Sequence, residues 1–343
     1  MKPSQRHLAL LSRWGGLSLS AALLCACSST PLPPTEGEPP ASAVSAPSAA
    51  SAAASASTAQ VEAVTTAVIT PQVLSTPGDA DSYSARDDAR ALARDIAQAH
   101  ELDEAWVWSA LSAARYKSQA ARLMMPAPRG TAKNWGVYRS RFIEPIRIRA
   151  GIAFWQQYQA ELQRAQAQYG VPAEIIAGVI GVETIYGRYT GNFRVLDVLT
   201  TLSLAFPTGR SDRSPFFKKE LGAFLKLCAE QQLAPDAVLG SYAGAIGWPQ
   251  FMPSSIRRWG VDFDGDGQVN LQRSPVDAIG SVAHYLAEHG WRTGQPTFFD
   301  VTPPEDAAAR AKLLAPDIVP SFSADEMRAL GAILPDQQRQ GGD

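Results

Sequence analysis

The sequence has no excess of positive charge. Its 31 lysines and arginines are slightly outnumbered by 33 aspartates and glutamates, and the formal net charge is −2. Binding to nucleic acid depends on clustered positive charge that faces the phosphates. The lack of a basic field therefore excludes nucleic acid as a partner.

Cysteine is scarce as well, with three residues in a chain of 343. A framework of disulfides cannot brace the fold, so a hydrophobic core has to hold it together. Cys228 lies in the apolar helical stretch FLKLCAEQQL, which is typical of a cysteine that fills space in a core.

The N-terminus also lacks a long hydrophobic run. Residues 17–26 (LSLSAALLCA) follow a positively charged start and are too few to span a bilayer, which predicts a signal peptide over residues 1–26. Its end resembles the lipobox of bacterial lipoproteins, and this resemblance implies that Cys27 carries a lipid. Ser28 in place of aspartate then implies the periplasmic face of the outer membrane of a Gram-negative bacterium. An ordinary signal peptide with incidental cysteines is the alternative.

Composition and periodicity divide the rest of the chain. Residues 27–83 are rich in alanine, serine and proline, which predicts a disordered linker. Residues 84–170 read as a helical region, beginning with the amphipathic stretch ARDDARALARDIAQAHEL and a helix that Asp103 can cap. A further helical period runs through residues 135–169 and is broken at Pro145. Residues 171–298 form the predicted core and residues 299–343 a C-terminal region, with weak strand signals only at residues 297–301.

One carboxylate lies on an apolar helix face. In residues 172–186 (PAEIIAGVIGVETIY), Glu183 follows Ile176, Val179 and Ile180 by one or two helical turns, which places it among buried side chains. Burial disfavours the charged form of a carboxyl group and raises its pKa, as a proton donor at neutral pH requires. Gly187 predicts the end of this helix. The alternative is a structural glutamate satisfied by an arginine or a backbone group.

Five ordered motifs carry a resemblance to a known family: GVPAEIIAGVIGVETIYGRYTG, NFRVLDVLTTLSLAFP, GSYAGAIGWPQFMPSS, VDFDGDG and SPVDAIGSVAHYLAEHGW. Together they resemble the membrane-bound lytic murein transglycosylase B family, glycoside hydrolase family 103. The resemblance implies a mainly α (α+β lysozyme-like) fold, in which a helical catalytic core carries an added N-terminal helical region and a small C-terminal appendage. It also implies that Glu183 is the single catalytic acid/base.

The same resemblance implies the reaction. The enzyme would cleave the β-1,4 bond between N-acetylmuramic acid and N-acetylglucosamine in peptidoglycan glycan strands, leaving 1,6-anhydromuramoyl ends. Ser241 and Gln250 would line the cleft, and Phe251, Tyr285 and Tyr138 would flank bound sugars, although each aromatic residue could simply pack in the core. Asp197 lies inside a helix and is expected to cap or pair rather than to act in catalysis. We expect a monomer without an organic cofactor.

An acidic loop follows the spacing of an EF-hand. Asp262, Asp264 and Asp266, with the backbone carbonyl of Gln268, suit a calcium ion. The resemblance implies that Asp277 completes the set and that the ion is structural. The alternative is a loop of Asx turns without a metal.

Three other functions compete with the transglycosylase. A hydrolytic muramidase on the same fold needs a second acid and a water near Glu183. A non-catalytic peptidoglycan-binding lipoprotein needs no acid, and a calcium sensor needs paired EF-hands, of which the sequence shows one. Family members continue into an aromatic-rich segment that completes the cleft, and residues 299–343 resemble only the start of that region.

Overall fold

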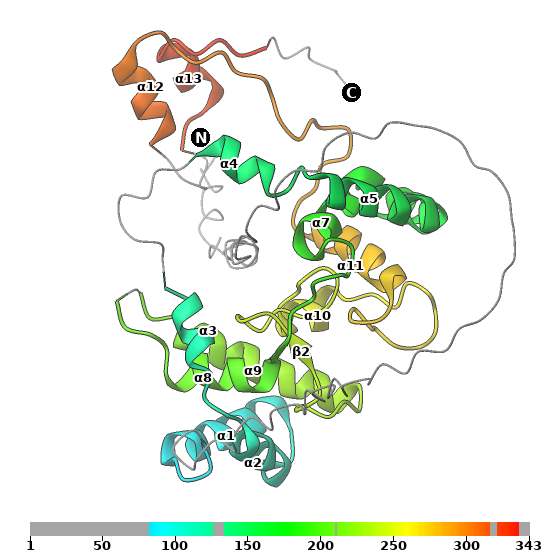
Figure 1. Cartoon of the computed structure of the whole chain (residues 1–343), viewed down its shortest axis with the longest axis vertical. Coiled ribbons are helices and arrows are strands. Elements are labelled where there is room, and N and C mark those ends of the chain that lie inside the picture. Colours follow the sequence, from blue (N-terminus) through cyan, green and yellow to red (C-terminus); the bar gives the residue numbers. More distant parts are fainter. Residues whose placement is uncertain (1–81, 126–133, 210, 316–320, 336–343) are drawn as a thin grey trace, which may run out of the picture. The chain divides into compact units, whose positions relative to one another are not determined.

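The structure is a computed structural model that describes residues 82–125, 134–209, 211–315 and 321–335 (Figure 1). The chain divides into two compact units, residues 1–286 and 287–343, and each is described by itself. The described part is mainly helical, which confirms the predicted fold class. Cys27, the predicted signal peptide and nearly all of the predicted linker lie outside the described residues.

The described part of the first unit begins with the helices α1 (Asp87–His100), α2 (Glu104–Ala113) and α3 (Ser118–Leu123). Helix α1 buries the face that the sequence indicated, formed by Ala89, Leu92, Ala93 and Ile96. Asp103 caps α2, because its side chain accepts a hydrogen bond from the Trp106 N–H. Both predictions are confirmed.

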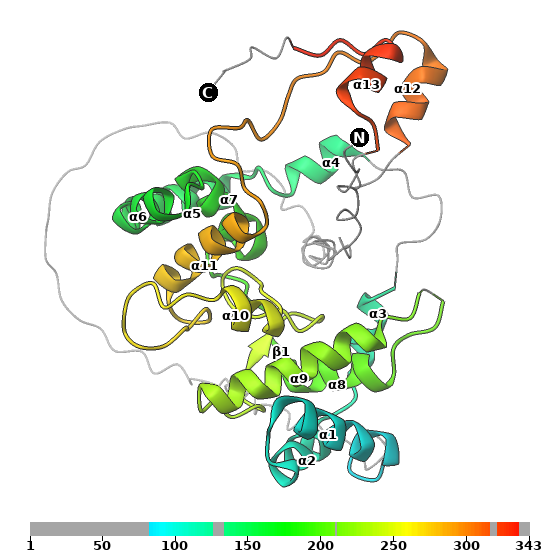
Figure 2. The same cartoon turned by 180° about the vertical axis from the view of Figure 1, so that it is seen from behind.

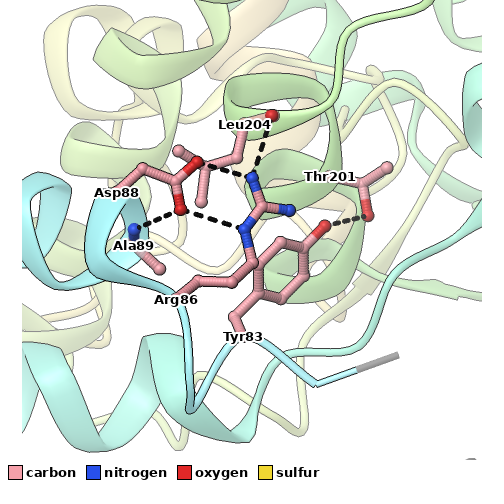
Figure 3. A network of polar contacts seen from close by, with 6 residues as sticks. All are labelled: Tyr83, Arg86, Asp88, Ala89, Thr201 and Leu204. Carbon is pink, nitrogen blue, oxygen red and sulfur yellow. Dashed lines mark hydrogen bonds and ion pairs between the residues drawn. The ribbon is translucent and has the colours of Figure 1, made fainter. Parts of the chain in front are cut away.

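The segment before α1 is tied to the body of the unit (Figure 3). Tyr83 is only 1% exposed, and its hydroxyl donates to Thr201 Oγ1 over 3.3 Å. Arg86 donates to both carboxylate oxygens of Asp88 and to the Leu204 carbonyl. Tyr83, which composition had placed at the end of the linker, is therefore part of the core.

Helices α4 (Trp135–Ser140), α5 (Pro145–Gln157) and α6 (Gln159–Tyr169) follow, and Pro145 begins α5 as its break predicted. The isoleucines that gave this segment its period are not in the core. Ile146, Ile148 and Ile152 are each at least half exposed, whereas α5 buries Arg147, Ala150 and Phe154. The period predicted a helix correctly, but the buried face is the other one.

Helix α7 (Ala173–Thr184) packs against α5 and α6, and α8 (Val195–Leu204) lies beside α9 (Ser214–Glu230), as both views show (Figures 1 and 2). Helix α10 (Pro253–Trp259) packs on α9, and α11 (Pro275–Glu288) ends near the boundary of the unit. Two short strands, β1 (Phe193–Arg194) and β2 (Leu239–Gly240), pair antiparallel. This pairing joins the start of α8 to the loop over residues 240–252.

Asp197 is buried inside α8 and pairs with basic side chains through both carboxylate oxygens. Its Oδ1 accepts from the Arg115 N–H over 2.9 Å and lies 3.5 Å from a guanidinium nitrogen of Arg194. Its Oδ2 lies 3.3 Å from Lys117 Nζ, an ion pair without hydrogen-bond alignment. Asp197 therefore pairs, as predicted, and connects α8 to the start of α3.

The second unit contains α12 (Ala307–Leu314) and α13 (Ala324–Ala329), and an isolated β-bridge joins Thr302 to Ile333. Residues 297–301 form no strand, so the weak strand signal there was wrong. Across the described residues of both units, no helix has the length and apolar character needed to cross a bilayer.

Candidate active site

Glu183 lies in the last turn of α7, one and two turns after the buried residues Ile180 and Ile176. Its side chain is itself mostly buried, and this burial raises the pKa of its carboxyl group to about 7. Within the described residues, the Glu183 carboxyl group has no hydrogen bond or ion pair to another side chain or to the backbone. A carboxyl group without a partner charge, protonated near neutral pH, can donate a proton to a bound ligand.

The chain leaves α7 through a left-handed turn. Ile185, Tyr186 and Gly187 have φ angles of 50°, 55° and 78°. The helix ends at Thr184, so its left-handed cap is Ile185 rather than the glycine that the sequence indicated. Non-glycine residues in this region, above all a β-branched one, are strained and persist where the surroundings hold them.

Thr184 is one of the side chains that hold this turn. Its hydroxyl donates to the Trp248 carbonyl over 2.8 Å and accepts from the Gly187 N–H over 3.0 Å. Gly187 lies so close to the Trp248 ring that a Cβ added there would come within 2.6 Å of a ring carbon. The end of α7 is therefore fastened to the loop over residues 240–252.

Ser241 and Gln250 are both buried and both support this loop. The Ser241 hydroxyl accepts from the Ala245 N–H over 3.0 Å, and the Gln250 amide donates to the carbonyls of Thr190 and Gly247 over 3.0 and 2.9 Å. Gln250 also has a positive φ of 52°. Their contact with a substrate remains a prediction; what the structure gives them is a role in shaping the loop.

The predicted sugar-binding aromatic residues fall into two groups. Phe251 packs on Tyr285 of α11, with ring centroids 5.0 Å apart, and Trp259 meets the same tyrosine edge-on at 5.1 Å. Tyr138 lies on α4 and contacts Trp135 and Phe142. The structure thus brings Phe251 and Tyr285 together, but places Tyr138 in a separate cluster.

Glu220 is a buried carboxylate that the sequence analysis missed. It accepts from the Ser254 N–H and hydroxyl, over 3.0 and 2.6 Å, and so holds the first turn of α10. Its pKa is raised, chiefly by burial, although both bonds from Ser254 act the other way. Among the described residues, the carboxylates of Glu220, Asp197 and Asp277 are buried, and each is engaged with partners of its own.

The acidic loop gathers three carboxylates. Asp262, Asp264 and Asp266 each offer an oxygen, and these atoms lie within 4.8 Å of one another. Gly265 and Gly267 have positive φ angles, and loop N–H groups bond to Asp262. These charges repel unless a cation joins them, so the group fits a hard divalent ion such as calcium.

Asp277 plays a different part in the same loop. Its Oδ1 accepts from the N–H groups of Phe263 and Asp264, and its Oδ2 from that of Asn270. It lies outside the group of three carboxylates. Asp277 therefore braces the loop backbone, and ligation of an ion by Asp277 or by the Gln268 carbonyl stays a prediction.

Comparison with known proteins decides the family. The family described as Transglycosylase SLT domain matches residues 84–342. This chain belongs to that family. Membrane-bound lytic murein transglycosylase B of Escherichia coli (strain K12) is 44% identical over 203 residues, which are 57% of this chain and 55% of that protein. The match thus spans about half the length of this curated relative.

Solved structures of the family agree. The catenated lytic transglycosylase SltB1 from Pseudomonas aeruginosa is 41% identical, with a TM-score of 0.69 over 75% of this chain and 82% of that one. The Escherichia coli lytic transglycosylase Slt35 in complex with calcium is 36% identical, with a TM-score of 0.63 over 77% and 79%. The family resemblance and the lysozyme-like helical fold are therefore confirmed.

Proposed function

We propose that this protein is a peptidoglycan lytic transglycosylase that uses Glu183 as its only acid/base. The observation that carries the proposal is the state of Glu183: mostly buried, unpaired among the described residues, and with a pKa of about 7. Family membership supports the choice of substrate, a glycan strand with β-1,4 bonds between N-acetylmuramic acid and N-acetylglucosamine.

The reaction needs one carboxyl group in two states. Protonated Glu183 gives its proton to the bridging oxygen as the bond from C1 of the muramic acid breaks, while the N-acetyl group of that sugar supports C1. The C6 hydroxyl of the same sugar then attacks C1 and returns its proton to Glu183. A 1,6-anhydromuramoyl end forms, no water is consumed, and the acid is regenerated.

The other buried carboxylates favour this reaction over hydrolysis. A hydrolytic muramidase needs a second carboxylate that is free to hold a water or to attack C1. Among the described residues, Asp197, Glu220 and Asp277 are committed to ion pairs or hydrogen bonds. The arrangement therefore supports a substrate that supplies its own nucleophile.

Digestion of purified peptidoglycan tests the proposal. The protein should release anhydromuropeptides, whose mass is lower by one water than that of products with reducing ends. Glu183→Gln should release none, whereas Glu174→Gln, a change in the exposed first turn of the same helix, should behave as the wild type. Reducing ends would point to a hydrolytic muramidase. If Glu183→Gln keeps the full biological effect, the protein is a non-catalytic peptidoglycan-binding lipoprotein.

We also propose a structural calcium ion held by Asp262, Asp264 and Asp266. The ion would neutralise three neighbouring carboxylates and fix a loop whose Leu271 carbonyl accepts from the Trp248 N–H over 2.9 Å. A ligand that binds only the folded state raises its stability, by about 2.7 kcal/mol at a hundred-fold excess over Kd. Calcium should therefore raise the melting temperature of the wild type and of Asp236→Asn, an exposed control, but not that of Asp264→Asn.

The N-terminal sequence supports attachment to the outer membrane through a lipid on Cys27, with the enzyme on the periplasmic side. The variant Cys27→Ala should lose labelling by a fatty-acid precursor and leave the membrane fraction. Retention of label in that variant would exclude Cys27 as the site of lipidation.

A further inference from the structure

The ring of Tyr186 occupies a slot between two helices. A Cβ added at Gly181 of α7 would lie 2.5 Å from the Tyr186 hydroxyl oxygen, and one added at Gly151 of α5 would lie 2.6 Å from it. Real Cβ atoms do not come so close to other atoms, so the slot exists only because both positions are glycine. The Phe154 ring closes its side, with centroids 5.0 Å apart.

A buried arginine reaches the same place. Arg147 Nε donates over 2.9 Å to the Gly181 carbonyl, which also accepts from the Ile185 N–H over 3.2 Å. The guanidinium is held in turn by Glu144 Oε1 and by the Arg141 carbonyl. Tyr186 and Arg147 therefore both act on Gly181, two residues before Glu183.

This arrangement accounts for a backbone that would otherwise unwind. Tyr186 is one of two adjacent non-glycine residues in the left-handed region, and such residues need packing that leaves them no alternative. A ring confined between two helices provides that restraint. If the ring leaves the slot, the last turn of α7 keeps the Thr184 bonds but loses the packing that restrains its left-handed backbone.

We propose that Tyr186, locked between Gly151 and Gly181 and backed by Arg147, is a positioning residue that fixes the last turn of α7 and so aims the Glu183 carboxyl at the substrate. The inference rests on the proposed function, in which Glu183 is the acid/base. Tyr186 acts through the helix and has no contact with the reacting atoms.

Two alanine substitutions on the same helix test this. Gly181→Ala drives a Cβ into the slot, whereas Gly178→Ala meets nothing within 4 Å and serves as the matched control. Each full-length variant is followed by its melting temperature, by kcat and KM across pH, and by an NMR titration of labelled glutamate carboxyls, with Glu183→Gln to assign the signal.

Gly181→Ala should move the turn and let water reach the acid. The pKa of Glu183 should fall by about one pH unit or more, and kcat should fall by about ten-fold or more while KM changes little. Gly178→Ala should change neither quantity.

A second test places the added Cβ on α5 and combines it with a substitution at Tyr186. This test remains available if Gly181→Ala fails to fold. Gly151→Ala should show the same two losses, because its Cβ meets the Tyr186 hydroxyl. Adding Tyr186→Phe removes that hydroxyl and leaves the nearest ring carbon 3.0 Å from the added Cβ. The double variant should therefore regain most of the Glu183 pKa and most of kcat. Tyr158→Phe removes a hydroxyl that, within the described residues, accepts a hydrogen bond from exposed Gln157 alone, and it should rescue nothing.

The outcomes separate the two proposals. If Gly181→Ala and Gly151→Ala lower only the melting temperature, and leave the Glu183 titration and kcat unchanged, then the slot is merely structural and the inference is overturned. The same holds if Tyr186→Phe fails to restore Gly151→Ala. The titration needs no substrate, so a folded wild type without activity on peptidoglycan would instead count against the proposed function.

Discussion

Two glutamates on one helix show how strongly position decides chemistry. Glu174 is exposed in the first turn of α7, where the helix dipole favours a negative charge. Glu183 lies in the last turn, on the buried side, and burial raises its pKa to about 7. The dipole at that end also disfavours a carboxylate. Glu183 is therefore suited to hold a proton at neutral pH.

The pH dependence of the reaction should follow this carboxyl group. Since Glu183 has to be protonated at the start of each cycle, kcat/KM should fall about ten-fold per pH unit above a midpoint near 7. Initial rates on soluble glycan fragments between pH 5 and 9 measure it. Glu174→Gln should leave the midpoint in place. A profile that stays level through pH 9 would contradict the assignment of Glu183 as the acid.

The same burial means that Glu183 should lower the free energy of unfolding at high pH, where its carboxyl group is charged. A carboxyl group whose pKa is about 7 in the folded state and near 4.5 when unfolded binds more protons in the folded state between those values, so stability falls as pH rises through them. At pH 8, Glu183→Gln should raise the free energy of unfolding by up to roughly 3 kcal/mol, and at pH 4 by almost nothing. Urea unfolding at both pH values measures the difference. An equal effect at both would show that the pKa is not raised.

At the scale of elements, the site is the junction of α7 with the loop over residues 240–252. Thr184 ties the two together through the Trp248 carbonyl, and the Trp248 N–H reaches the acidic loop at Leu271. The backbone of a single residue, Trp248, therefore connects the end of α7 to the acidic loop. Displacement of the acidic loop should therefore shift the position of the Glu183 carboxyl group.

Thr184→Val should weaken this junction without changing the side-chain shape. The variant leaves the Trp248 carbonyl and the Gly187 N–H without their partner, which should cost roughly 1–3 kcal/mol of unfolding free energy. Thr208→Val, at an exposed position, should cost far less. Chemical denaturation of both variants gives the comparison, and equal losses would mean that the hydroxyl does not hold the junction.

Helices were predictable where apolar periodicity or a capping residue marks them, as in α1 and at Asp103. The left-handed turn after Glu183 was not, because it uses isoleucine and tyrosine where the sequence offered Gly187 as the stop. The face of α5 was misread for a similar reason, since a buried arginine replaces isoleucine in the core. Periodicity in the sequence predicts that a helix forms. Which face of that helix is buried depends on the segments that pack against it, and these come from the rest of the fold.

At the scale of the whole molecule, the predicted linker ends earlier than composition indicated. Composition placed the end of the linker at residue 83, yet Tyr83 is among the largest fully buried side chains and bonds to Thr201 of α8. Ser82 forms a bridge with Arg115. Tyr83 therefore anchors the start of the described chain to the body of the unit.

Shortening the chain should reveal the anchor as a sharp boundary. A protein that begins at residue 82 should keep its melting temperature, whereas Tyr83→Ala in the same protein should lose roughly 3–5 kcal/mol, as expected for emptying a buried aromatic site. Tyr83→Phe should lose little, because Thr201 Oγ1 still accepts from the Lys117 N–H. Calorimetry of the three proteins measures these differences. If Tyr83→Ala proved as stable as its parent, the segment before α1 would contribute nothing to the core and would belong to the linker after all.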